Sequence, residues 1–163
     1  MEEEMIERAE AYAARRARYL AGRLGFGIYG MVFVLEGNDE PGASALKIHQ
    51  NAEPYSRERD VYGRLAETGI RTILDFSVPG LIACDDRLLA IEMTIVQPPL
   101  VLDFAGAWLD FPPRFADEVW AERREKWAEE FGPDWPKAQE IMAELENMGI
   151  HMLDPSPSNL RFR

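Results

Sequence analysis

Cysteine and histidine are scarce in this chain of 163 residues, which contains one cysteine, Cys84, and two histidines, His49 and His151. A single cysteine cannot form a disulfide within the chain, which fits a reducing compartment. One cysteine and two histidines are also too few for a zinc site unless carboxylates supply most of the ligands. The composition therefore argues against a disulfide-stabilised scaffold and against a zinc centre.

Basic residues are also outnumbered, because 18 lysines and arginines stand against 29 aspartates and glutamates, for a formal net charge of −11. So acidic a chain is not expected to bind nucleic acid or an anionic membrane surface through its overall charge. The first residues, Met-Glu-Glu-Glu, have the wrong charge for a signal peptide, and no apolar run is long enough to span a membrane. We therefore expect a cytoplasmic protein without a nucleic-acid or membrane partner.

Apolar residues are plentiful, at 47% of the chain, which is enough for one compact core with room for two lobes. Their spacing changes between helical and strand-like along the chain, which predicts an α+β fold. The expected elements are an amphipathic helix over 2–22, strands over 24–35 and 43–50, a helix over 54–67, and β-rich sequence over 72–96. The sequence GNDEPG at 37–42 is a strong turn signal between the first strands.

The composition changes after residue 96, where prolines begin to occur in pairs between two helical stretches at about 115–130 and 135–148. We therefore place a domain boundary there, between 1–96 and 97–163. The second part reads as a small helical lobe. We interpret the tryptophans of its first helix as core residues. The alternative is that the tryptophan-rich segment 108–135 forms a surface for a protein partner.

Three glycines, Gly25, Gly27 and Gly30, form the pattern G-x-G-x-x-G-x-V within an apolar stretch. In a dinucleotide-binding fold such a pattern opens a helix. Here the residues after Gly30 continue as a β-branched run, which favours a strand-loop-strand hairpin. Backbone N–H groups exposed by missing side chains can bind phosphate oxygens. The pattern predicts a phosphate-covering hairpin with Tyr29 near its tip as a lid.

Lys47 and Glu58 occupy positions that would each be unfavourable alone. Lys47 lies among apolar neighbours in a predicted strand, where burying an unpaired ammonium costs several kcal/mol. Glu58 falls on the apolar stripe of the helix at 54–67, between Tyr55 and Tyr62. Because each charge needs a partner, we predict that Lys47 and Glu58 pair and that Lys47 binds the phosphates of a nucleotide.

The order of these features resembles a protein-kinase-like fold over roughly residues 20–163. Near the end of the sequence, Asp154 and Asn159 match the D-x-x-x-x-N spacing of the kinase catalytic loop. The resemblance implies an antiparallel N-lobe sheet with one helix of the αC type, an added N-terminal helix and a reduced helical C-lobe. It implies ATP as ligand, Asp154 as catalytic base and Asn159 as a ligand of a weakly bound Mg²⁺.

Several positions depart from the protein-kinase pattern. Met152 and Leu153 stand where that family has His and Arg, and Ser156 replaces a lysine, as in RIO-type and small-molecule kinases. No D-F-G motif follows Asn159, so its Mg²⁺-binding aspartate is expected to be missing. Asp103, just after the interlobe linker, lies where kinases often place an acid that contacts the ribose.

The first functional hypothesis is therefore a minimal kinase-like ATP-binding protein, weakly active or inactive, acting as a pseudokinase-type regulator. The second is an active phosphotransferase that uses Asp154 as base, with the missing metal ligand supplied by a partner or by a C-terminal extension. The third is a non-enzymatic interaction module that binds a protein partner or a second copy of the chain. A dinucleotide-binding enzyme is the least favoured.

Overall fold

The computed structural model describes residues 1–37 and 42–163. The turn predicted at 37–42 falls mainly on residues 38–41 and so lies outside the described residues. The helices are α1 (Glu2–Arg15), α2 (Ala52–Thr68), α3 (Asp117–Phe131) and α4 (Trp135–Asn147), with a 3-10 turn at Gly132–Asp134 between the last two. The longer strands are β1 (Arg18–Gly27), β2 (Gly30–Gly37), β3 (Ser44–His49), β6 (Leu81–Asp85) and β7 (Ala90–Thr94). The short strands are β4 (Thr72–Ile73), β5 (Phe76–Ser77), β8 (Val101–Leu102), β9 (Ala107–Leu109), β10 (Ile150–Met152) and β11 (Leu160–Arg161).

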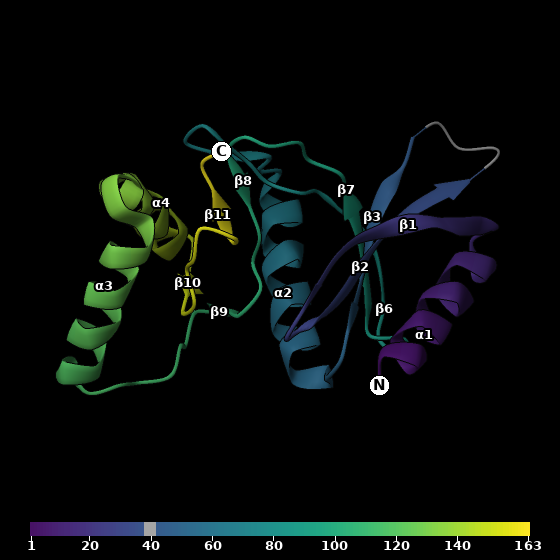
Figure 1. The fold of residues 1–163 in the computed structure, drawn as a ribbon, viewed down its shortest axis with the longest axis horizontal. Coiled ribbons are helices and arrows are strands. Elements are labelled where there is room, and N and C mark those ends of the chain that lie inside the picture. The colour runs from purple at the N-terminus through teal and green to yellow at the C-terminus, as the bar shows by residue number, and fades with distance from the viewer. Residues whose placement is uncertain (38–41) are drawn as a thin grey trace.

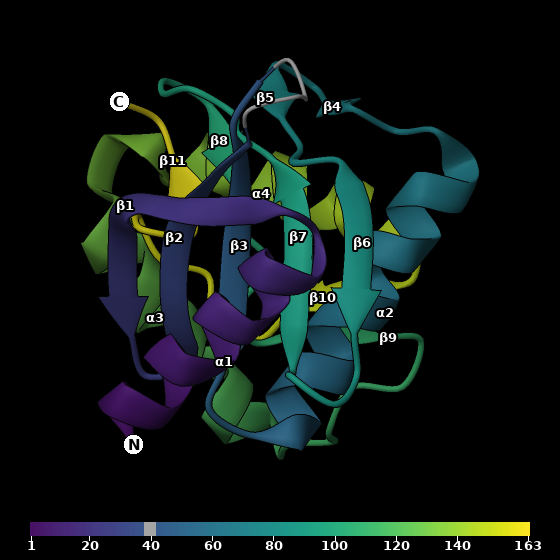
Figure 2. The same cartoon turned by 90° about the vertical axis from the view of Figure 1, so that its right-hand side faces the viewer.

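The longer strands form one antiparallel sheet in the order β1-β2-β3-β7-β6. Helix α1 covers one face of this sheet, and α2 lies on the other face, between the sheet and the helices α3 and α4 (Figure 1). Figure 2 shows α1 crossing in front of the sheet. The sheet is therefore covered on both faces, and every residue of its central strand β3 is buried.

Strand β3 alternates between these two faces, as successive residues of a strand must. Leu46 and Ile48 belong to the apolar cluster beneath α1, whereas Ala45 belongs to the larger cluster that includes α2. The alternation turns Lys47 and His49 toward α2 as well. Lys47 and His49 thus face the same helix.

Helix α1 ends at Arg15, earlier than the predicted helix over 2–22. After it, Ala17 takes a positive φ of 53°, and strand β1 begins at Arg18. The extended backbone brings the Arg18 guanidinium to Glu92 on β7, the strand that pairs with β3. The helix is shorter than expected because Arg18 is used in this pairing.

Glu92 is fully buried and accepts hydrogen bonds from three side chains on three elements. Arg18 Nη1 donates to Oε1 at 2.7 Å, Ser44 Oγ donates to Oε1 at 2.7 Å, and Tyr12 OH donates to Oε2 at 2.9 Å. Because burial would otherwise penalise the charge, these donors make Glu92 the polar link between α1, β1 and the sheet.

The second part of the chain contains a two-stranded sheet, β10-β9, and a four-stranded sheet in the order β11-β8-β5-β4 among the described residues. Strand β11, at the end of the sequence, runs antiparallel to β8, and β8 runs parallel to β5. The four-stranded sheet therefore joins strands from both sides of residue 96. The boundary between 1–96 and 97–163 stays a prediction.

The mixed α+β fold is confirmed, with an antiparallel sheet followed by a smaller helical part, and it is consistent with the expected kinase-like N-lobe. The helix predicted over 54–67 is α2, and its buried side chains include the predicted Tyr55, Glu58 and Tyr62. In the part of the chain that the structure describes, no helix has the length and apolar character needed to cross a bilayer.

Removal of the Glu92 carboxylate is predicted to destabilise the fold, because it leaves the buried Arg18 guanidinium without its main charge partner. We expect Glu92→Ala to lower the free energy of unfolding by about 3–5 kcal/mol, measured by urea denaturation. As a control, Glu36→Ala removes a carboxylate that accepts a bond from the exposed Tyr19, and should lower it by less than about 1 kcal/mol. Equal losses in the two variants would contradict this account.

Candidate functional site

The β1–β2 hairpin contains the three predicted glycines. They differ in whether the fold leaves room for a side chain at their position. A side chain at Gly30, where φ is +156°, would bring its Cβ to 2.0 Å from the carbonyl oxygen of Ile48, so the fold itself requires glycine there. A Cβ at Gly25 or Gly27 would meet no atom within 4 Å. The space beside these two glycines is open, and the fold gives no reason for either.

Lys47 and Glu58 form the predicted ion pair between β3 and α2. Lys47 Nζ donates to Glu58 Oε1 at 2.7 Å, and the exposed fractions of the two side chains are 7% and 2%. Burial alone would lower the pKa of Lys47, but the charges of Asp103 and Glu58 outweigh it and raise the pKa above its ordinary value. Burial alone would raise the pKa of Glu58, but Lys47 and His49 lower it to about 2. Both groups are therefore charged at neutral pH.

Asp103 is the second carboxylate beside Lys47. Its Oδ1 lies 3.4 Å from Lys47 Nζ and accepts a hydrogen bond from the backbone N–H of Ala105 at 3.0 Å. The Asp103 side chain is 39% exposed, unlike Glu58. Glu58 thus holds the Lys47 ammonium from the side of α2, and Asp103 faces the open side of the site.

Strand pairing brings the end of the sequence to the same place. Strand β11 lies against β8, and the backbone N–H of Asp103 donates to the carbonyl oxygen of Asn159 at 2.8 Å. Asn159 Nδ2 donates to the backbone oxygen of Asp154 at 2.9 Å, which closes the 154–159 loop. The Asn159 amide oxygen and the Asp154 carboxylate accept no hydrogen bond from another described residue.

A cavity of about 330 Å³ lies among these groups, with Gly25, Gly27, Gly30, Lys47, Asp103, Asp154 and Asn159 in its lining. An adjoining cavity of about 280 Å³ continues from it, and Lys47, Glu58, Asp103 and Arg161 line this second space together with mainly apolar side chains. The apolar members include Leu24, Val32, Met93, Ile95, Val101 and Leu102. The predicted site residues therefore meet in one cleft with a polar end and an apolar end.

Asp103 lines the cavity beside Lys47, although the sequence indicated only a ribose contact for it. Residues 103–106 read Asp-Phe-Ala-Gly, which is D-F-G with one residue, Ala105, inserted before the glycine. Phe104 is fully buried and packs edge-to-face on Tyr62 of α2, with ring centroids 5.4 Å apart. The short Asp-Phe sequence after an apolar pair was the available signal. It was overlooked because the motif was expected only after Asn159.

The donor set of the cleft suits Mg²⁺ only together with a nucleotide. No three His, Cys, Asp or Glu side chains come close enough to hold a metal ion anywhere in the described ranges. Mg²⁺, however, is commonly held by one or two carboxylates, phosphate oxygens and water. Asp103, Asp154 and the amide oxygen of Asn159 line the same cavity and would provide the protein's share of such a shell.

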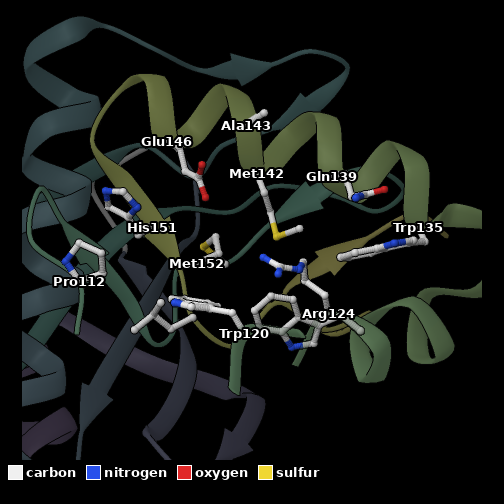
Figure 3. Close-up of a pocket in the computed structure, with 12 residues that line it drawn as sticks. Pro112, Trp120, Arg124, Trp135, Gln139, Met142, Ala143, Glu146, His151 and Met152 are labelled. Carbon is white, nitrogen blue, oxygen red and sulfur yellow. The ribbon is translucent and has the colours of Figure 1, made fainter. Parts of the chain in front are cut away.

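A third cavity, of about 360 Å³, lies between α3, α4 and β10 and shares no lining residue with the Lys47 cleft (Figure 3). Trp120, Trp127 and Trp135 line it, and Trp127 is itself buried in the core. His151, which directly precedes the position where protein kinases have the His of H-R-D, lines this cavity and not the Lys47 cleft. Trp127 is buried, as the core interpretation predicts, whereas Trp120 and Trp135 are partly exposed.

No protein-family model matches this chain, and no curated protein matches it. Solved kinase domains of PknI from Mycobacterium tuberculosis overlap with its backbone. One, a variant with a single cysteine-to-alanine substitution, is 16% identical with a TM-score of 0.42, over 81% of this chain and 48% of that domain. The unsubstituted domain is 15% identical with a TM-score of 0.38, over 81% and 48%. This chain spans about half the length of these domains.

The low pKa of Glu58 predicts a specific loss of stability in acid. Because its folded pKa of about 2 lies below the ordinary value of 4.5, the unfolded chain takes up the proton first as the pH falls. Glu58 should therefore contribute about 3 kcal/mol above pH 4.5 and lose this contribution between about pH 4.5 and pH 2. Urea unfolding over this range should show a steeper fall for the wild type than for Glu58→Gln. Parallel curves would contradict the charged pair.

Proposed function

We propose that this chain is a kinase-like protein that binds ATP in the Lys47 cleft. The main support is one observation: the Lys47–Glu58 pair lies in the same cleft as two glycines that the fold does not require. A buried ammonium held by a carboxylate is a fixed cation for phosphate oxygens. Open glycine backbone allows phosphates to approach the N–H groups closely. The apolar end of the cleft is suited to a planar base.

The glycine hairpin offers a test in which folding and binding can be separated. Gly27 lines the cavity and has open space beside it, so Gly27→Val should fold normally but fill the space where phosphates approach. We expect calorimetric titration with ATP to show at least about tenfold weaker binding than the wild type, a loss of about 1.4 kcal/mol.

Gly22→Val is the matched control, because Gly22 lies on the same strand with equally open space and lines none of the cavities described above. It should bind ATP as the wild type does. The proposal fails if the wild type binds no ATP at millimolar concentration. Equal affinity in Gly27→Val and the wild type would remove the hairpin from the site.

Within this proposal, the first candidate function is that of a pseudokinase-type regulator, in which ATP binding stabilises a conformation and little or no phosphoryl transfer occurs. The departures at Met152, Leu153 and Ser156 from the catalytic-loop pattern support it. A cytoplasmic location and a protein partner, or a second copy of the chain, stay predictions that accompany this function.

A second candidate is an active phosphotransferase, and the position of Asp103 favours it. Asp103 would supply within the chain the metal ligand expected from a partner or an extension, since it lines the cavity with Asp154 and Asn159. When bound, Mg²⁺ would neutralise charge on the phosphates. Asp154 would accept the proton of the attacking hydroxyl while that oxygen bonds to the γ-phosphorus and ADP leaves.

ADP formation separates the two candidates. For the phosphotransferase, we expect ADP from ATP and Mg²⁺, with water as acceptor, to form about a hundredfold more slowly in Asp154→Asn, because the general base is lost. Asp103→Asn should bind ATP but lose the enhancement of binding by Mg²⁺. ATP binding by the wild type without ADP formation would support the regulator. ADP formation that persists unchanged in Asp154→Asn would overturn the role of Asp154.

A further inference from the structure

Glu58 has a second buried partner besides Lys47. His49 Nε2 lies 2.8 Å from Glu58 Oε2, while Lys47 Nζ donates to Oε1. Lys47 and His49 are two residues apart on β3 and face α2 together. The two oxygens of one carboxylate therefore bind two donors from the same face of the same strand.

The His49 ring is enclosed on all sides. It is fully buried, and Tyr55 packs against it edge-to-face with ring centroids 5.6 Å apart. Its Nδ1 has no hydrogen-bond partner among the described residues. The ring thus has one polar contact, Glu58. Because a carboxylate oxygen accepts, Nε2 must carry a hydrogen.

This second bond restricts what Glu58 can do. A carboxylate held through one oxygen can still turn about its terminal torsion, whereas two donors on its two oxygens fix both its position and its plane. The bond from His49 Nε2 also satisfies the buried Oε2, while Oε1 accepts the bond from Lys47.

We propose that His49 is a positioning residue, which fixes Glu58 so that Lys47 stays placed for the nucleotide phosphates before any nucleotide binds. The inference rests on the proposed ATP-binding function and deepens it. With this role for His49, α2 is docked against β3 in the free protein. Lys47 and His49 are the two polar side chains of β3 that bind Glu58 of α2. A core histidine without this role would contribute packing alone.

Two substitutions separate positioning from packing. His49→Gln places an amide N–H near the position of Nε2 and keeps a donor for Glu58, whereas His49→Leu is apolar and cannot donate. Both variants lose the ring contact with Tyr55. We expect calorimetric titration to show ATP binding within about threefold of the wild type for His49→Gln and at least about tenfold weaker for His49→Leu, the loss typical of one hydrogen bond to a charged group.

Unfolding by urea, measured on the same samples, reports the packing loss that the two variants share. Equal ATP affinities in His49→Gln and His49→Leu would overturn the positioning role even if both variants were destabilised. Absence of ATP binding by the wild type would instead overturn the proposed function.

A nucleotide-free measurement tests the geometry directly and needs no variant. The ¹⁵N chemical shifts of the His49 ring in the wild type should show a hydrogen on Nε2. The Nδ1–H tautomer would place a nitrogen lone pair against Glu58 Oε2 and would overturn the inference.

Discussion

The ion pair between Lys47 and Glu58 is the interaction around which the cleft is arranged. Either charge alone at this interface would cost several kcal/mol, so the pair is stable only while α2 stays docked on β3. That docking places His49 on the second oxygen of Glu58 and leaves the ammonium facing Asp103. The helix and the Asp103 segment therefore meet at Lys47, on the strand with which β2 of the hairpin pairs.

Residues that are far apart in the sequence lie together in the cleft because the strands that carry them pair with each other. Asp103 follows β8, and Asn159 precedes β11, yet the pairing of these two strands places both residues beside the Lys47 cavity. A hydrogen bond of 2.8 Å from the Asp103 N–H to the Asn159 carbonyl oxygen fixes the positions of the two residues relative to each other. An acidic residue that lies well before the 154–159 segment in the sequence thus lines the same cavity as Asp154 and Asn159.

The parts of this arrangement that sequence could predict are those with local signals. Helical periodicity placed Glu58 on a buried stripe, and the cost of burying Lys47 in a strand required a partner. The Arg18–Glu92 pair was not predictable, since its members are 74 residues apart and Arg18 falls within the amphipathic helix predicted over 2–22. The role of Asp103 depends on two-residue strands, which are too short to show a periodicity. The glycine pattern likewise could not reveal that the fold requires only Gly30 of the three.

The central claim is that ATP binds in the Lys47 cleft, and an NMR titration of the wild-type protein with ATP tests it most directly. The account predicts that the amide signals of Gly25 and Gly27 and the Lys47 ammonium signal shift together and saturate, while the indole signals of Trp120 and Trp135 in the separate cavity stay in place. Shifts confined to the tryptophans, or no shift at millimolar ATP, would contradict it.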